Sequence, residues 1–270
     1  MTPIFSIVMA YHNRKPLLLH TLRSIAASTQ AKYTEVIIVD DGSSDDHRLE
    51  DIVDDYPFVI KLIRQETEDK WYINPCIPFN LGIKEATGDI IVIQNPECFH
   101  LGDVLNFATP IDDNAYYSYH AYSLSQENTE KMKSIDPKVI NELGNNLNTS
   151  YLPFEIKNVR MNEEGGEGYY NHYQHRATGY HFCAITKRHN MEDLGGFDER
   201  YATGSGFDDN ELVERVKRKG LDLFFVGYPM VLHQNHYKGW NPAPPYLINQ
   251  NLKLFNEVTL QETTWRANQK

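Results

Sequence analysis

Short apolar runs alternate with amphipathic segments along the first hundred residues of the chain. Runs of this length between turn residues indicate buried strands. We expect strands at 4–10, 35–39, 59–63 and 90–93. A helix with apolar residues at helical spacing is expected after Asn13, which would cap it, and a second from Pro78 to Glu85. Strands and helices in this order predict an α/β fold, with a mostly parallel central sheet flanked by helices.

The alternation is lost after about residue 105, and residues 112–178 are rich in Tyr, Asn, Glu and His. The glycine- and glutamate-rich stretch 162–170 is typical of a mobile loop. Further on, the pattern again predicts strands and then a closing helix. The strands are expected at 182–185, 223–226 and 230–232, and the helix at 246–258.

Two glycine-rich turns, at 195–199 and 204–207, each lead into acidic residues. The second opens onto Asp208 and Asp209 and then onto an amphipathic helix, which Gly220 is placed to end. Carboxylates at a glycine-rich turn can be presented into a cleft, which suits a general base. The structural alternative is that Asp208 caps the helix and Glu211 completes a capping box, although this would leave Asp209 unexplained.

Polar clusters follow three of the predicted strands, where ligands bind in open parallel sheets. They are Tyr11-His12-Asn13, Asp40-Asp41 and Gln94-Asn95-Pro96-Glu97. Asp40 can accept hydrogen bonds from a nucleobase or a ribose, as acidic residues at strand ends do in nucleotide-binding folds. The chain has neither a Gly-X-Gly-X-X-Gly sequence nor a P-loop, so a nucleotide diphosphate would depend on a metal ion and on side chains.

Glu97, His233 and His236 each come just after a predicted buried strand. A carboxylate with imidazoles suits Mn²⁺, and it tolerates Mg²⁺ when phosphates supply further oxygens. We therefore expect Glu97 and His236 to converge on one cation, with His233 as a further ligand. A single histidine in such a place would more often be structural.

Composition narrows the choice of partners. The chain has 270 residues, 41% of them hydrophobic and 23% charged, as in a soluble globular protein. Its net charge of −11 argues against nucleic acid or an anionic membrane surface as the main partner. Three cysteines without zinc-type spacing fit reduced thiols, so we expect a cytoplasmic protein. The start of the sequence does not read as a signal peptide, and no run is long enough for a membrane span.

Three stretches, in this order, make the chain resemble the family 2 glycosyltransferases. They are residues 6–14, residues 39–45 with Val-Asp-Asp-Gly-Ser-Ser-Asp, and residues 80–89 with Asn-Leu-Gly-Ile and Ala-Thr-Gly-Asp. Residues 195–215 are similar to a C-terminal signature of the β-1,4-galactosyltransferases and chondroitin polymerases. The resemblance covers residues 4–100 and 180–240 and leaves the middle unmatched.

The resemblance implies one GT-A catalytic domain over 1–270. Residues 1–105 would be its nucleotide-binding half, 106–240 its acceptor-binding half and 241–270 a C-terminal extension. It further implies a nucleotide-sugar donor, expected to be a UDP-sugar, a glycan or other hydroxyl acceptor, and Mn²⁺ or Mg²⁺. Reaction would be a single displacement at the anomeric carbon with inversion.

Site residues follow from the same resemblance. Asp209 matches the catalytic base, and Asp208 matches a neighbouring carboxylate that contacts the acceptor. His236 and His233 match metal ligands. Residues matching the donor-nucleotide site are Ala10, Tyr11, Asn13, Asp40 and Asn95.

One departure from the family pattern concerns the Asp-X-Asp metal motif, which is replaced here by Asn95-Pro96-Glu97. Glu97 can replace the metal-binding aspartate, whereas Asn95 offers a metal less charge. Two outcomes are open: an enzyme that holds its metal more weakly, or a sugar- or nucleotide-binding module that has lost catalysis. A nucleotidyltransferase is a third possibility, but Tyr11-His12-Asn13-Arg14-Lys15 lacks the glycine-rich loop usual after the first strand.

Overall fold

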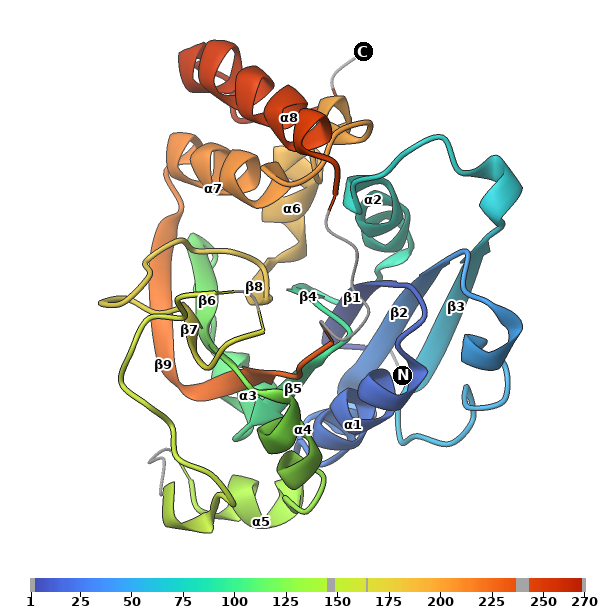
Figure 1. The fold of residues 1–270 in the computed structure, drawn as a ribbon, viewed down its shortest axis with the longest axis vertical. Coiled ribbons are helices and arrows are strands. Elements are labelled where there is room, and N and C mark those ends of the chain that lie inside the picture. Colours follow the sequence, from blue (N-terminus) through green and yellow to red (C-terminus); the bar gives the residue numbers. More distant parts are fainter. Residues whose placement is uncertain (1–2, 145–148, 164, 237–242, 269–270) are drawn as a thin grey trace.

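The computed structural model describes residues 3–144, 149–163, 165–236 and 243–268. Within these ranges a nine-stranded sheet runs through the molecule, with helices on both faces (Figure 1). The strands are β1 Phe5–Tyr11, β2 Thr34–Asp41, β3 Val59–Gln65, β4 Ile90–Gln94, β5 Cys98–Leu101, β6 Ala115–Ser123, β7 Gly168–Asn171, β8 Cys183–Lys187 and β9 Asp222–His233. The helices are α1 Lys15–Ala26, α2 Cys76–Glu85, α3 Val104–Ala108, α4 Gln126–Met132, α5 Pro137–Glu142, α6 Arg188–Leu194, α7 Asp208–Lys219 and α8 Pro245–Glu257.

The strand order is β3-β2-β1-β4-β8-β6-β9-β5, and β7 pairs with β6. Strands β3, β2, β1 and β4 are parallel, which confirms the parallel sheet expected for the first hundred residues. Beyond β4 the sheet is mixed, because β8 is antiparallel to both β4 and β6, β9 is parallel to β6, and β5 is antiparallel to β9. The carboxyl ends of β1, β2 and β4 therefore lie along one edge.

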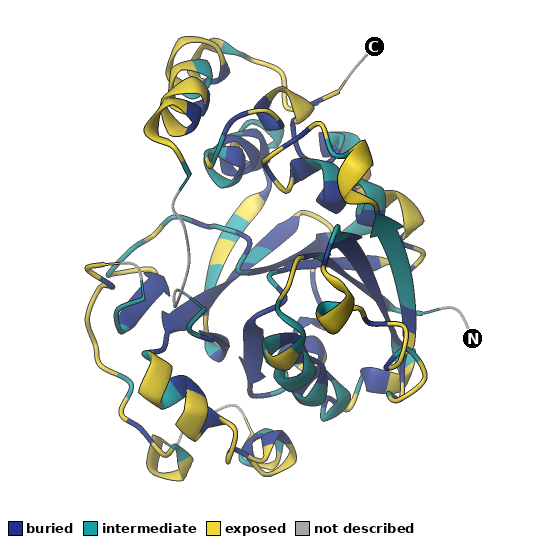
Figure 2. Ribbon diagram, turned by 45° about the vertical axis from the view of Figure 1, so that its right-hand side comes forward, coloured by how far each residue is buried: buried dark blue, intermediate teal, exposed yellow. Residues whose placement is uncertain are grey.

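Alternate residues of the central strands face opposite layers of helices, as the two-residue period of a strand requires. On β1, Ile7 and Met9 belong to the apolar cluster that includes residues of α1 and α3, while Val8 belongs to the cluster that includes residues of α2, α6 and α7. All three side chains are fully buried. Figure 2 shows the central strands as the most buried part of the molecule and α8 as largely exposed. The apolar runs thus form a sheet that is covered on both faces.

Several elements differ from the sequence expectations. Asn13 does not cap α1: Arg14 is at the cap position, and Asn13 Oδ1 instead accepts the backbone N–H of Ser44 at 2.9 Å. The strands expected at 223–226 and 230–232 are one continuous strand, β9. Residues 168–170 of the expected loop belong to β7, which pairs with β6, while residue 164 lies outside the described residues. The boundary expected at residue 240 also lies outside them.

Helix α7 begins without a side-chain cap. Asp208 is its first residue, and Phe207 at the cap position has a left-handed φ of 65°. Glu211 does not complete a capping box, because its carboxylate binds Arg215 one turn further on. The capping alternative for Asp208 is therefore wrong. Gly220 ends the helix with φ of 79°, as expected.

The closing helix is confirmed as α8. Among the residues described, none of the helices combines the length and the apolar character needed to cross a bilayer.

Candidate active site

A cavity of about 390 Å³ opens at the carboxyl ends of β1 and β4. Ala10 and Tyr11 of β1 and the turn Asn95-Pro96-Glu97 after β4 line one part of it. Asp208 and Asp209 at the start of α7 line another part. The glycine-rich turn before α7 thus brings the acidic pair to the strand ends, and two regions about a hundred residues apart in the sequence share one cavity.

Glu97, His233 and His236 form a cluster at this edge. The Nε2 atoms of both histidines lie 3.3 Å from Glu97 Oε1. Strand pairing explains the contact, because Cys98 of β5 is opposite His233 of β9 and the backbone N–H of Gln234 donates to the Glu97 carbonyl at 3.1 Å. The convergence expected of Glu97 and His236 is therefore confirmed, and His233 joins them.

The donor atoms of this cluster fit a divalent cation. One carboxylate oxygen and two imidazole nitrogens lie within 4.8 Å of one another. Oxygen and imidazole donors together suit Mn²⁺ and similar ions, and ligands from the substrate would complete the coordination. Glu97, His233 and His236 would hold such an ion.

Arg14 also binds Glu97, a contact that the sequence did not suggest. Its Nη1 donates to Oε1 at 3.1 Å and to Oε2 at 3.0 Å. Burial raises the pKa of Glu97, but Arg14 and the two histidines outweigh burial and hold that pKa well below its usual range. The available signal was positional: Arg14 follows β1, Glu97 follows β4, and these strands are parallel neighbours.

Asp208 and Asp209 are held by different partners. Asn74 donates to Asp208 Oδ1 at 2.8 Å, and the backbone N–H of His181 donates to Asp209 Oδ1 at 3.0 Å. Nδ1 of His181 lies 2.5 Å from the same oxygen. Burial and the neighbouring charge of Asp209 raise the pKa of Asp208. His181, which lines the cavity, is a second residue that the sequence did not suggest.

The five residues expected at the nucleotide divide into two sets. Ala10, Tyr11 and Asn95 line the cavity. Asp40 does not line the cavity and is fully buried. Arg64 Nη1 lies 2.7 Å from Asp40 Oδ2, and the Ser43 N–H donates to Asp40 Oδ1 at 2.9 Å.

Asn13 is also held away from the cavity, by its bond to Ser44. The cavity residue at the end of β2 is instead Asp41, whose carboxylate accepts from Lys70 at 2.5 Å and from the Tyr72 hydroxyl at 2.6 Å.

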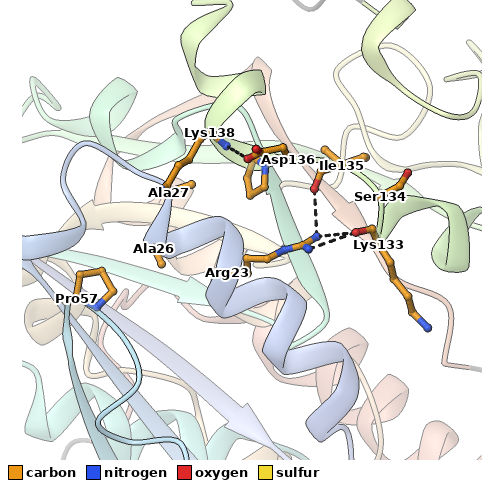
Figure 3. A pocket seen from close by; sticks show the side chains of 10 residues that line it. Arg23, Ala26, Ala27, Pro57, Lys133, Ser134, Ile135, Asp136 and Lys138 are labelled. Carbon is orange, nitrogen blue, oxygen red and sulfur yellow. Dashed lines mark hydrogen bonds between the residues drawn. The ribbon is translucent and has the colours of Figure 1, made fainter.

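A larger hollow of about 600 Å³ lies elsewhere, between α1 and the segment that leads into α5 (Figure 3). Its most prominent polar group, the Arg23 guanidinium, donates to the carbonyls of Lys133 and Ile135 at 3.2–3.3 Å. These contacts join α1 to the segment before α5, whereas Glu97, Asp208 and Asp209 line the smaller cavity.

Solved structures with a similar fold are glycosyltransferases. Residues 1–349 of S. aureus TarS in complex with UDP-GlcNAc match with a TM-score of 0.61 at 15% identity, over 98% of this chain and 68% of that one. GalNAc-T7 with UDP, GalNAc and Mn²⁺ matches with a TM-score of 0.59 at 17% identity, over 91% and 46%. The mannosyltransferase PcManGT of Pyrobaculum calidifontis, with GDP-Man and Mn²⁺, gives 0.53 at 14%, over 95% and 71%. The fold is therefore GT-A.

Sequence comparison agrees with this likeness. An uncharacterized glycosyltransferase of Bacillus subtilis (strain 168), YfnE, is 23% identical over 268 residues, covering 86% of this chain. The chain spans 64% of the length of that relative. The profile of glycosyl transferase family 2 matches residues 6–173, more than half of the chain. The chain therefore belongs to glycosyl transferase family 2.

Proposed function

We propose that the chain is a metal-dependent, inverting glycosyltransferase that moves a sugar from a UDP-sugar to a hydroxyl group of a glycan or similar acceptor. The observation that carries the proposal is the shared cavity, which is lined both by Glu97 of the Glu97–His233–His236 cluster and by the Asp208–Asp209 pair. Its nucleotide part rests on the similar structures that hold UDP, UDP-GlcNAc or GDP-Man.

Each cluster has one chemical task in this proposal. A divalent cation at Glu97, His233 and His236 would act as a Lewis acid toward the diphosphate leaving group. Asn95 can hydrogen-bond the ribose, and Ala10 and Tyr11 would border the base. Direct contacts from Asp40 and Asn13 would require those side chains to leave their present partners.

Asp209 is the proposed general base. Its carboxylate accepts the acceptor's hydroxyl proton while the hydroxyl oxygen attacks the anomeric carbon. The bond from that carbon to the diphosphate breaks at the same time, so the configuration inverts. Asp208, which is buried and bonded to Asn74, would contact the acceptor.

Product analysis tests this function. Nucleotide sugars are incubated with the protein and Mn²⁺ or Mg²⁺, with and without candidate acceptors, and products are followed by mass spectrometry. Asp209→Asn should reduce turnover by at least about 100-fold, the usual scale of general-base catalysis, and chelation with EDTA should abolish it. Asp46→Asn, at an exposed carboxylate, is the matched control. Full turnover by Asp209→Asn would reject Asp209 as the base.

A second function, a binding module without catalysis, is favoured by the surroundings of Glu97. Arg14 already supplies a positive charge to Glu97, and Asn95 stands where a metal-binding carboxylate is usual. Such a module would bind UDP equally well with and without metal ion, which calorimetry would show. It would also turn over none of the donors in the screen.

A further inference from the structure

His181 contacts Asp209 through two separate groups. Its backbone N–H donates to Asp209 Oδ1 at 3.0 Å, and its ring Nδ1 lies 2.5 Å from that same atom. Asp209 Oδ2 takes part in neither contact. One carboxylate oxygen thus accepts the backbone hydrogen bond and also lies against the ring nitrogen.

The imidazole of His181 is itself held by aromatic packing. Its ring meets Phe79 and Phe197 edge-on, each at a centroid distance of 4.9 Å, and the two phenyl rings stack at 5.0 Å. Only 6% of the His181 side chain is exposed, compared with 28% of the Asp209 side chain. Rotating the imidazole away would therefore open a gap in a packed aromatic cluster.

The charges around the pair also favour this arrangement. Burial lowers the pKa of His181, but the carboxylates of Asp209 and Asp208 outweigh it and raise the pKa above the usual value. The imidazole lies next to two adjacent carboxyl groups, of which Asp208 is bonded separately to Asn74. The negative charge of these aspartates also helps to raise the pKa of three neighbouring groups, Tyr116, Tyr180 and Cys76.

We propose that His181 is a positioning residue for Asp209 during glycosyl transfer: it holds Oδ1 and leaves Oδ2 to accept the acceptor's proton. This inference rests on the function proposed above. In the reaction, the hydroxyl proton passes to Oδ2, the acceptor oxygen bonds to the anomeric carbon, and the diphosphate leaves with the electrons of the broken bond. In this role His181 acts through Asp209, whose carboxylate it keeps oriented.

Three variants test the proposal: His181→Ala, His181→Asn and Asp209→Asn. The asparagine side chain keeps a neutral N–H donor and lacks a positive charge. We expect His181→Ala to lower kcat by about 10–100-fold with an almost unchanged KM for the donor, because the orientation of the base is lost while donor binding is not. His181→Asn should recover part of that loss.

A purely structural role predicts a different result. Wild-type kcat in His181→Ala, or a loss of kcat of which His181→Asn recovers nothing, would overturn the proposal. If His181→Ala fails to fold, His181→Asn decides alone: it should lower kcat with an almost unchanged KM for the donor, and wild-type kcat in this variant overturns the proposal.

Asp209→Asn distinguishes a failure of the positioning role of His181 from a failure of the proposed function. If it abolishes turnover while both His181 variants behave like wild type, the positioning role fails and the glycosyltransferase function stands. If Asp209→Asn turns over normally, the proposed base is itself wrong.

Discussion

Arg14 and Glu97 form an ion pair in which one guanidinium nitrogen contacts both carboxylate oxygens, at 3.0 and 3.1 Å. The Glu97 side chain is 3% exposed and the Arg14 side chain 33%. The same Oε1 atom is the one that His233 and His236 approach. Arg14 and a divalent cation would therefore compete for one carboxylate.

Arg14→Gln should separate these two partners of Glu97. Without metal the variant should be less stable by about 1 kcal/mol, or roughly 2–4 °C in midpoint, because a buried carboxylate loses a partner that is itself partly solvated. With Mn²⁺ its midpoint should rise by more than that of wild type, since the ion no longer displaces the guanidinium. Thermal unfolding with and without Mn²⁺ measures both effects. Arg48→Gln, which breaks an exposed pair with Asp45, is the control. Equal metal-induced shifts in Arg14→Gln and wild type would refute the competition.

Glu97→Gln should weaken Mn²⁺ binding by at least about 100-fold, because the neutral amide removes the only carboxylate of the three-residue cluster. Titration calorimetry with MnCl₂ measures the affinity directly, without any assay of transfer. Glu85→Gln, at an exposed position at the end of α2, is the control and should bind Mn²⁺ like wild type. Unchanged affinity in Glu97→Gln would place the metal elsewhere.

The buried pair Glu211–Arg215 should be important for stability. Both side chains are at most 1% exposed, and the guanidinium also donates to the carbonyls of Leu194 and Gly196 at 2.7 and 2.9 Å. Arg215→Met should cost about 3–5 kcal/mol, because it leaves a buried carboxylate without its cation. The double variant Glu211→Leu/Arg215→Met should be more stable than Arg215→Met alone. Urea unfolding of the variants measures this, and a double variant that is less stable than Arg215→Met would contradict the expectation.

Two histidines whose rings are in contact, His120 and His172, should make the fold sensitive to acid. Burial lowers the pKa of His120 to about 3 and that of His172 to about 4, and neighbouring histidines add to both shifts. Since both values lie below the ordinary 6.5, the unfolded chain takes up protons first. Stability is therefore complete above about pH 6.5 and is lost as the pH falls toward 4. The loss should reach up to about 2 kcal/mol per histidine at pH 5.

His120→Gln checks this prediction. Glutamine can still accept the backbone N–H of Tyr173, which His120 Nε2 now accepts at 3.3 Å, and it does not titrate. Urea unfolding at pH 7 and pH 5 should show a clearly smaller loss of stability in the variant. An identical loss in both proteins would mean that other groups cause it.

The sequence predicted those parts of the site that follow a strand. Apolar runs located β1, β2 and β4, and the residues just beyond them were expected to meet because parallel strands end at one edge. Glu97 was found because it follows β4, and His236 because it follows the apolar run at 230–232; their contact is confirmed. Asp209 was singled out by the glycine-rich turn and lies in the same cavity.

Contacts that depend on strand register or on isolated residues were not predictable. Asp40 is paired with Arg64 because these residues are opposite each other on β2 and β3, and the sequence does not state that register. His181 stands between Tyr180 and Phe182 without any spacing that marks it. Gly227-Tyr228-Pro229 separates the apolar runs 223–226 and 230–232, so the pattern predicts two strands where the structure has the single strand β9.

The pairing of β5 with β9 sets the distance between Glu97 and the two histidines, so residues far from these side chains can affect the Glu97–His233–His236 cluster. Gly102 follows β5 with φ of 92°, and a Cβ there would come within 2.9 Å of Tyr228 and Pro229. A methyl group at this position would push the two strands apart at the far end of their pairing. A Gly102→Ala protein would then bind a metal ion less well because β5 and β9 are misaligned, although Glu97, His233 and His236 are unchanged. Screens for inactive variants should therefore also find substitutions well outside the cavity.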